Sequence, residues 1–325
     1  MIRLLNSARH LHSSTTRQAV SELSIPVPWG DIRGQVWGPA HGYPVLCLHG
    51  WSDNCGTFKN LIPLLPKECR YVAVDLPGHG RSSHRPPGVL YSFPLYVMDV
   101  RRVIDALQWN KFSILGHSMG GNVGTMFSSL YPEMVDSLVL LDTGGFLPFE
   151  EKEIPGIMKR GFEEMLQFEK QAKEKLKVYT YEKSVERLIA ANPSLSEQSA
   201  QTLLERGLSQ VEGGLVFSRD FRINLTNVGR ITLGQSLVML SKIQASVLVV
   251  LAEDGLVKQY PRFEKSYSAL LQAHLDRNHK VVTVPGDHHI HLNKAEAVAP
   301  LVSDFLQNKV LSQSADQTNQ QTSKL

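Results

Sequence analysis

The chain contains 325 residues, of which 42% are hydrophobic and 20% are charged, an ordinary balance for a globular protein with one large core. The formal net charge of +3 is too small to indicate nucleic acid or a membrane surface as a partner. No apolar run approaches the roughly 18 residues that a transmembrane helix needs, so we expect no membrane span. Three cysteines, Cys47, Cys55 and Cys69, lack C-x-x-C spacing, which predicts free thiols.

Residues 1–19 predict a disordered basic leader. They contain Arg3, Arg9 and Arg17 among several Ser and Thr, and the first acidic residue is Glu22. This composition is typical of a mitochondrial transit peptide, and a basic leader without a targeting role is the alternative.

Beyond the leader, short apolar strands alternate with helical patterns. Strands are predicted at 20–27, 32–37, 44–48, 71–74, 112–115, 138–141, 247–251 and 281–284, and helices at 57–65, 97–107, 123–130 and 295–306. This alternation predicts an α/β fold: a mostly parallel eight-stranded sheet with helices on both faces. We expect the core to comprise residues 20–144 and 236–308.

The alternation is interrupted over 145–235. Glu- and Lys-rich helices are predicted there at 157–178, 181–191 and 196–206, and no strand is expected before Val238. We interpret this segment as an inserted helical lid over the carboxyl ends of the strands, where open α/β sheets bind their ligands.

One stretch combines a buried strand, a serine between two glycines and the start of a helix. Gly116-x-Ser118-x-Gly120 follows the strand at 112–115, which is the context of a nucleophile elbow. Such a turn strains the serine backbone, requires small neighbours and points the following helix N-terminus at the hydroxyl. The pattern predicts Ser118 as a nucleophile, with an ordinary tight turn as the alternative.

Four motifs in this order resemble the lid-bearing α/β-hydrolases: His49-Gly50-Trp51, Asp75-x-x-Gly78-x-Gly80, Gly116-x-Ser118-x-Gly120 and Gly286-Asp287-His288. The stretches 48–54, 112–121, 132–136 and 284–292 closely resemble the serine hydrolase-like proteins. The resemblance covers residues 20–308. It implies the α/β-hydrolase fold and a serine hydrolase, and it brings no defined substrate.

The resemblance implies His288 as the general base, since Gly286-x-His288 has the family spacing. His289 and His291 are its rivals in sequence, and we interpret them as neighbours with structural roles. By the same analogy, the backbone amides of Trp51 and Met119 form the oxyanion hole, although Trp51 as a plain core residue is an alternative.

The acid that orients His288 is less defined. The family's usual position after the lid holds Gly255, with Asp254 one residue early. The other family position, at the end of the strand before the lid, holds Asp142. We favour Asp142, with Asp254 or no functional acid as alternatives. Asp75 is interpreted as a brace for its turn.

No metal and no cofactor are expected. The histidines at 288–291 suggest a metal, but no carboxylate or cysteine lies at ligand spacing. Phosphate-binding glycine motifs do not occur either.

These residues predict a hydrolase that cleaves an ester, thioester or amide of a small lipophilic substrate through a Ser118 acyl-enzyme. The alternatives are a non-catalytic ligand-binding protein on the same fold and a cofactor-free lyase or perhydrolase.

Residues 309–325 predict a disordered tail that ends in Ser323-Lys324-Leu325, a peroxisomal import signal. The expected partner is the peroxisomal import receptor. The expected location is the peroxisome or the cytoplasm, with the mitochondrion as the alternative.

Overall fold

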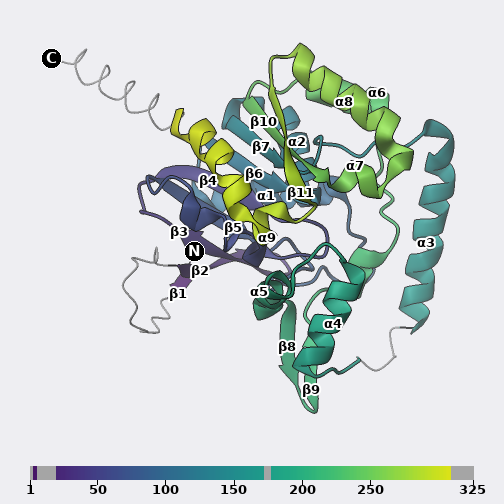
Figure 1. Cartoon of the computed structure of the whole chain (residues 1–325). Coiled ribbons are helices and arrows are strands. Elements are labelled where there is room, and N and C mark those ends of the chain that lie inside the picture. The colour runs from purple at the N-terminus through teal and green to yellow at the C-terminus, as the bar shows by residue number, and fades with distance from the viewer. Residues whose placement is uncertain (1–2, 6–19, 172–176, 309–325) are drawn as a thin grey trace.

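The computed structural model describes residues 3–5, 20–171 and 177–308, which form a mostly parallel sheet covered by helices on both faces (Figure 1). The strand order is β1-β2-β3-β5-β4-β6-β7-β10-β11. The expected strands are β2 (Ser21–Val27), β3 (Gly30–Trp37), β4 (Tyr43–Leu48), β5 (Cys69–Val74), β6 (Phe112–His117), β7 (Val135–Leu141), β10 (Ser246–Asp254) and β11 (Lys280–Asp287). The neighbouring strands β5, β4, β6, β7, β10 and β11 run parallel to one another. Strand β3 pairs antiparallel with both β2 and β5. The predicted sheet is confirmed.

A ninth strand, β1 (Arg3–Leu5), pairs antiparallel with β2. The structure differs here from the expected disordered leader, because the edge of β2 offers unpaired backbone N–H and C=O groups to a short extended segment. The remaining leader residues and the predicted tail at 309–325 lie outside the described residues.

The core helices are α1 (Phe93–Leu107), α2 (Met119–Leu130), α6 (Leu233–Leu240), α7 (Leu256–Gln259), α8 (Glu264–Asp276), α9 (Ile290–Asn293) and the C-terminal helix at 299–308. Helices α1, α2 and the C-terminal helix lie close to the predicted helices at 97–107, 123–130 and 295–306, whereas α6 to α9 were not predicted. The segment predicted as a helix at 57–65 instead forms two 3₁₀ turns, Cys55–Phe58 and Ile62–Leu64, the second with Pro63 in its first turn.

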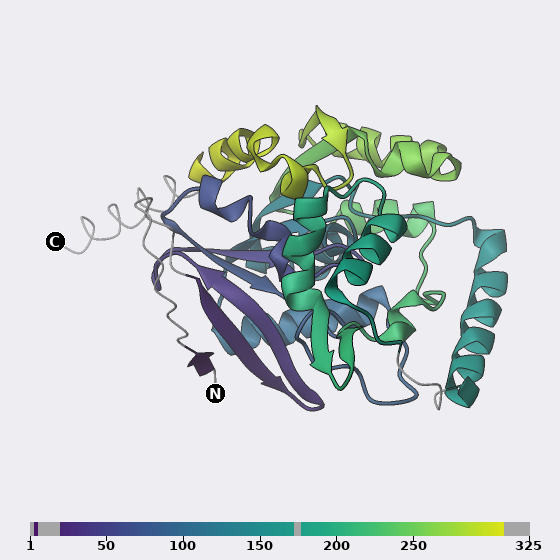
Figure 2. The same ribbon diagram turned by 60° about the horizontal axis from the view of Figure 1, so that its bottom comes forward.

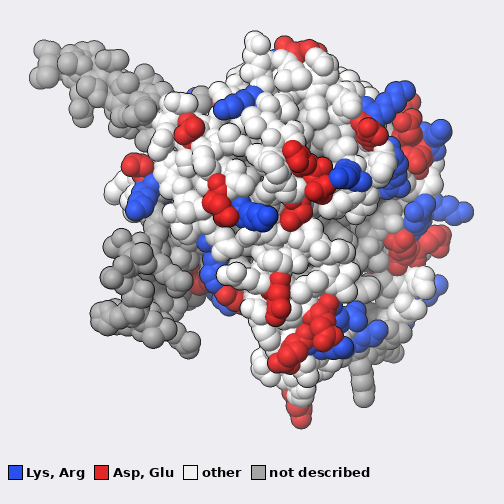
Figure 3. Space-filling model, in the orientation of Figure 1, with Lys and Arg blue, Asp and Glu red and all other residues white. Residues whose placement is uncertain are grey.

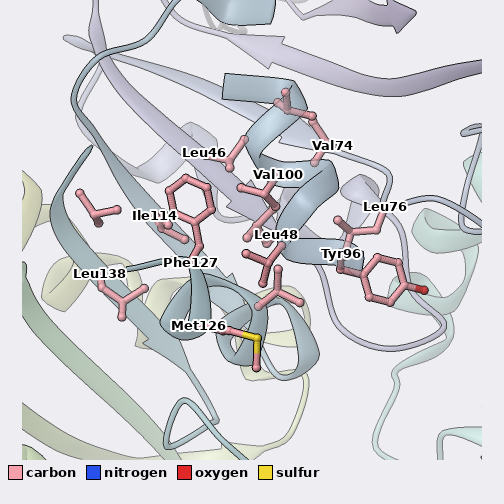
Figure 4. Close-up of a cluster of buried hydrophobic side chains, with 14 of the residues drawn as sticks. Leu46, Leu48, Val74, Leu76, Tyr96, Val100, Ile114, Met126, Phe127 and Leu138 are labelled. Atoms are coloured by element: carbon pink, nitrogen blue, oxygen red, sulfur yellow. The ribbon is translucent and has the colours of Figure 1, made fainter. Parts of the chain in front are cut away.

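The sheet separates two hydrophobic cores, because successive side chains of a strand point to opposite faces. In β4, Leu46 and Leu48 face one core with helices α1 and α2, whereas Val45 and Cys47 face the other with the 3₁₀ turns and the C-terminal helix. Figure 4 shows part of the first core, where Leu46, Leu48 and Phe127 pack together. Burial on both faces explains the continuous apolar runs of the central strands.

The insertion consists of α3 (Ile154–Gln171), α4 (Tyr181–Ala191) and α5 (Glu197–Gly207), followed by a hairpin of β8 (Leu208–Val211) and β9 (Gly214–Phe217). The expectation that this segment is only helical was wrong. Gly213 has a φ of +85°, which the tight turn between the two strands requires and which glycine adopts without strain. Figure 2 shows α4, α5 and the hairpin in front of the sheet, with α3 apart at the side.

A buried ion-pair cluster fastens the insertion to the core. Arg206 of α5 donates to Asp75 (Nη2–Oδ2, 2.7 Å) and to Glu22 (Nη1–Oε1, 2.7 Å), and the Arg206 and Asp75 side chains are at most 3% exposed. Asp75 also accepts hydrogen bonds from the amides of Cys55 and Arg81. Asp75 therefore braces its turn, and it also anchors α5.

None of the described helices is both long and apolar enough to cross a membrane. Cys47, Cys55 and Cys69 are buried and free, and burial raises the pKa of the Cys69 thiol to about 11. On the face shown in Figure 3, basic and acidic side chains are interspersed, as the sequence suggested for the helical insertion.

Candidate active site

Ser118 lies in a strained turn between β6 and α2. Its backbone angles are φ 49° and ψ −117°, a conformation that side-chain-bearing residues rarely adopt. A Cβ at Gly116 would lie 2.6 Å from the Gly121 amide nitrogen, and one at Gly120 would lie 2.1 Å from the Leu48 carbonyl oxygen. The two glycines of the motif thus allow α2 to start directly against the sheet. The strain is held in place by β6, which is buried along its whole length.

The structure brings Ser118, His288 and Asp142 together through two hydrogen bonds. His288 Nδ1 lies 2.5 Å from Asp142 Oδ2, and His288 Nε2 lies 3.0 Å from Ser118 Oγ. A carboxylate can only accept, so Nδ1 carries the proton and Nε2 is free to accept from the serine hydroxyl. The three residues follow the carboxyl ends of β6, β7 and β11. Their spatial arrangement is the one expected for an activated serine.

The carboxylate of Asp142 is held by the end of β10 and the start of α7. The amide of Ala252 donates to Oδ1 (3.0 Å), and the amide of Leu256 donates to Oδ2 (2.8 Å). Asp142 itself adopts a left-handed φ of 47° and is buried. These contacts leave the carboxylate in one orientation, facing His288.

Asp254, the alternative acid, points elsewhere. Its side chain is 61% exposed and pairs with Lys258 at i+4. The structure thus distinguishes the two candidates that the sequence left open, because only Asp142 contacts His288.

Hydrogen bonds from His117, His289 and Asn293 hold the loop that carries His288. His117 Nε2–H donates to the His288 carbonyl oxygen over 2.8 Å. Asp287 accepts from the His289 amide and from the Asn293 side chain. These bonds position the imidazole although its own side chain remains partly accessible, at 12% exposed.

The two predicted oxyanion donors follow strands β6 and β4 of the sheet. Met119 is the first residue of α2, and the first amides of a helix have no intrahelical partner. Trp51 follows β4, against whose last carbonyl α2 packs. The alternative of Trp51 as a core residue was wrong, since its side chain is 54% exposed and its Nε1 donates to the Ile223 carbonyl (3.0 Å).

The rivals of His288 are buried in a neighbouring polar cluster. His289 Nε2 lies 3.5 Å from Asp53 Oδ2, and His291 Nε2 lies 2.8 Å from Thr57 Oγ1. Sequence reasoning missed Asp53 and His117 as members of this cluster. Asp53 and His289 are far apart along the chain, so no spacing pattern could have found the pair.

Comparison with known proteins agrees with this geometry. A family model described as the alpha/beta hydrolase fold matches residues 43–295. A serine hydrolase-like protein of Danio rerio is 54% identical over 326 aligned residues, which cover 100% of both chains. Serine hydrolase-like protein 2 of Homo sapiens is 42% identical over 298 residues, 89% of this chain and 94% of that protein.

Two solved structures are also similar. A hypothetical protein of Pseudomonas aeruginosa PAO1 superposes with a TM-score of 0.79 at 34% identity, over 88% of this chain and 99% of that one. A thioesterase domain from the curacin biosynthetic pathway superposes with a TM-score of 0.74 at 26% identity, over 87% of this chain and 99% of that one. The chain therefore belongs to the α/β-hydrolase fold family and, within it, to the serine hydrolase-like proteins.

Proposed function

We propose that this protein is a serine hydrolase that cleaves an ester, thioester or amide of a small lipophilic carboxylic acid through an acyl-enzyme on Ser118. The observation that carries the proposal is the hydrogen-bonded chain from Ser118 through His288 to Asp142. In this chain Asp142 accepts a hydrogen bond from His288 Nδ1–H, and His288 Nε2 accepts one from the Ser118 hydroxyl.

In the proposed first step, Ser118 Oγ attacks the substrate carbonyl carbon while its proton passes to His288 Nε2. Asp142 keeps the imidazole oriented and stabilises the imidazolium that forms. The carbonyl oxygen becomes negative, and the amides of Trp51 and Met119 stabilise it. Each such donor contributes about 3–4 kcal/mol to the transition state.

Collapse of the tetrahedral intermediate breaks the bond to the leaving group, which takes the proton from His288 Nε2. A water molecule then attacks the acyl-enzyme and gives its proton to the same nitrogen. The carboxylic acid leaves, and the hydroxyl of Ser118 is restored.

The lipophilic substrate is supported by exposed aromatic side chains on the insertion side of the site. Trp51, next to the proposed oxyanion hole, is 54% exposed and hydrogen-bonds to the segment that contains Phe221. Phe221 is 66% exposed and stacks on Phe168 of α3, with ring centroids 6.2 Å apart. Helix α3 adds Phe162 at 47% exposure. Exposed aromatic side chains beside a site are typical of a surface that binds an apolar ligand. The similarity to a thioesterase domain supports an acyl thioester as one substrate type.

A fluorophosphonate probe, which reacts with activated serines, tests the proposal. We expect it to label the full chain, and we expect Ser118→Ala and His288→Ala to remain unlabelled. p-Nitrophenyl esters and acyl thioesters of increasing length then define the acyl group. A folded wild-type protein that neither reacts with the probe nor turns over any of these substrates is a ligand-binding protein instead.

We also propose that the protein is imported into peroxisomes through Ser323-Lys324-Leu325. Deletion of these three residues is expected to move a fluorescent N-terminal fusion from peroxisomes to the cytoplasm. Because such a fusion masks the basic leader, a C-terminal fusion tests the mitochondrial alternative separately.

A further inference from the structure

A second polar cluster lies beneath the loop of His288, and the proposed hydrolysis does not use its side chains. Asp53, His117 and His289 each point one potential ligand atom at a common point, and these three atoms all lie within 4.8 Å of one another. The three residues are all buried. They come from the loop after β4, the end of β6 and the loop after β11.

Hydrogen bonding defines which nitrogen of His117 faces this point. Nε2–H donates to the His288 carbonyl, which can only accept, so in the neutral imidazole Nδ1 carries a lone pair. Burial lowers the pKa of His117 to about 4, which favours this neutral form. Nδ1 faces Asp53 Oδ2 at 3.7 Å, and among the described residues neither atom has a hydrogen-bond partner. Two buried acceptors that face each other need a hydrogen-bond donor or a cation between them.

His289 completes the set. Its Nδ1 lies 3.2 Å from Ser194 Oγ, which can accept a hydrogen bond from Nδ1–H, so Nε2 is able to offer a lone pair toward Asp53 Oδ2, 3.5 Å away. Both imidazoles thus have an outer hydrogen-bond partner on the nitrogen that faces away from the cluster. This is the arrangement in which metal-binding histidines are held in proteins.

The spacing fits a small transition-metal ion. Zn²⁺ binds histidine nitrogen and carboxylate oxygen at about 2.0–2.2 Å, so ligand atoms on a tetrahedral ion lie about 3.3 Å apart. The separations of Asp53 Oδ2 from His117 Nδ1 and His289 Nε2, 3.7 and 3.5 Å, exceed that value by a few tenths of an ångström, and the two nitrogens lie within 4.8 Å of each other. Gly50 leaves the space open, because a Cβ there would lie 2.8 Å from His117 Nδ1 and 3.1 Å from Asp53 Oδ2.

We propose that Asp53 Oδ2, His117 Nδ1 and His289 Nε2 form a binding site for a divalent transition metal of the Zn²⁺ type, with water as the fourth ligand. The ion replaces a proton as the positive charge in the cluster.

The test uses full-length protein without a polyhistidine tag. After removal of bound metal with a chelator, we expect wild-type protein to take up one Zn²⁺ per chain. At a free concentration of about 100 times Kd, this raises Tm by about 5 °C. Asp53→Asn and His289→Gln are expected to lose this uptake and the shift in Tm. The matched control is His279→Gln, which removes one histidine from the separate pair of His274 and His279 and leaves uptake unchanged.

Co²⁺ provides an independent readout on the wild-type chain, which does not depend on how the variants fold. Bound at this site, it is expected to give the intense visible absorption of a tetrahedral ion. The proposal is overturned if wild-type protein binds neither ion, if Asp53→Asn binds Zn²⁺ as tightly as wild-type protein, or if Co²⁺ shows only the weak spectrum of an octahedral ion. In those cases a proton alone balances the cluster.

Discussion

The carboxylate of Asp142 occupies the space that a side chain at position 255 would fill: a Cβ on Gly255 would lie 2.2 Å from Asp142 Oδ1. The end of β10 and the start of α7, where the family's usual acid is found, here serve as a cradle for an acid supplied by β7. The amides of Ala252 and Leu256 hold that carboxylate from either side of the glycine.

Gly255→Ala is therefore expected to displace the Asp142 carboxylate and to misalign His288. Misplacement of a reacting group by about 1 Å costs about 10²-fold in rate, so we expect kcat for p-nitrophenyl ester hydrolysis to fall by that order. Gly234→Ala is the matched control, since the nearest atom to its Cβ is 3.9 Å away in an open part of the molecule. Wild-type rates in Gly255→Ala would show that the cradle is not needed.

Asp142→Asn and Asp254→Asn are expected to differ strongly in their effect on kcat. In the first variant an amide replaces the carboxylate that selects the imidazole tautomer, so kcat falls by about 10⁴-fold, as in other Ser–His–Asp hydrolases. Asp254→Asn changes only an exposed pair with Lys258 and leaves kcat within about twofold. Steady-state kinetics on one p-nitrophenyl ester measures both. The reverse order of effects would assign the acid to Asp254.

Two ion pairs of helix α5 are predicted to differ in their contribution to stability. Arg206→Met leaves the carboxylate of Asp75 buried without its cation, which lowers the free energy of unfolding by about 3–5 kcal/mol. Lys59→Met removes the exposed cation that pairs with Glu205 of α5. This change lowers the free energy of unfolding by less than about 1 kcal/mol. Urea unfolding of both variants provides the comparison, and equal losses would contradict this account of how the insertion is anchored.

Mild acid is predicted to destabilise the fold through His79. Burial, together with the neighbouring His49, lowers the pKa of His79 from 6.5 to about 3. The unfolded chain therefore binds this proton first, and stability is lost as the pH falls from about 6.5 toward 3. Between pH 7 and pH 5 this single group lowers the free energy of unfolding by about 2 kcal/mol.

The variant His79→Asn isolates this effect. Its free energy of unfolding, measured in urea at pH 7 and pH 5, is expected to depend less on pH than that of wild-type protein, by about the same 2 kcal/mol. An unchanged pH dependence would mean that His79 has the same pKa in the folded and the unfolded protein.

Much of the architecture was determined by the sequence alone. Continuous apolar runs predicted the central strands, since a strand buried on both faces needs hydrophobic residues throughout, and partly alternating runs predicted β2 and β3. The nucleophile elbow at Ser118 could be predicted because its requirements are local: two glycines, a strand and a helix within ten residues. The hairpin β8–β9 was missed because its strands are only partly buried and their pattern is weak.

Only the tertiary structure decided the rest of the site. Both Asp142 and Asp254 end a strand, and nothing local to either shows which one faces His288. The answer depends on backbone amides and a vacant side-chain position 110 or more residues away from Asp142. The cluster of Asp53, His117 and His289 is likewise formed from three distant segments. The spacing of residues along the chain predicts which of them meet within a single turn, helix or strand. Contacts between loops arise only when the sheet aligns the ends of its strands.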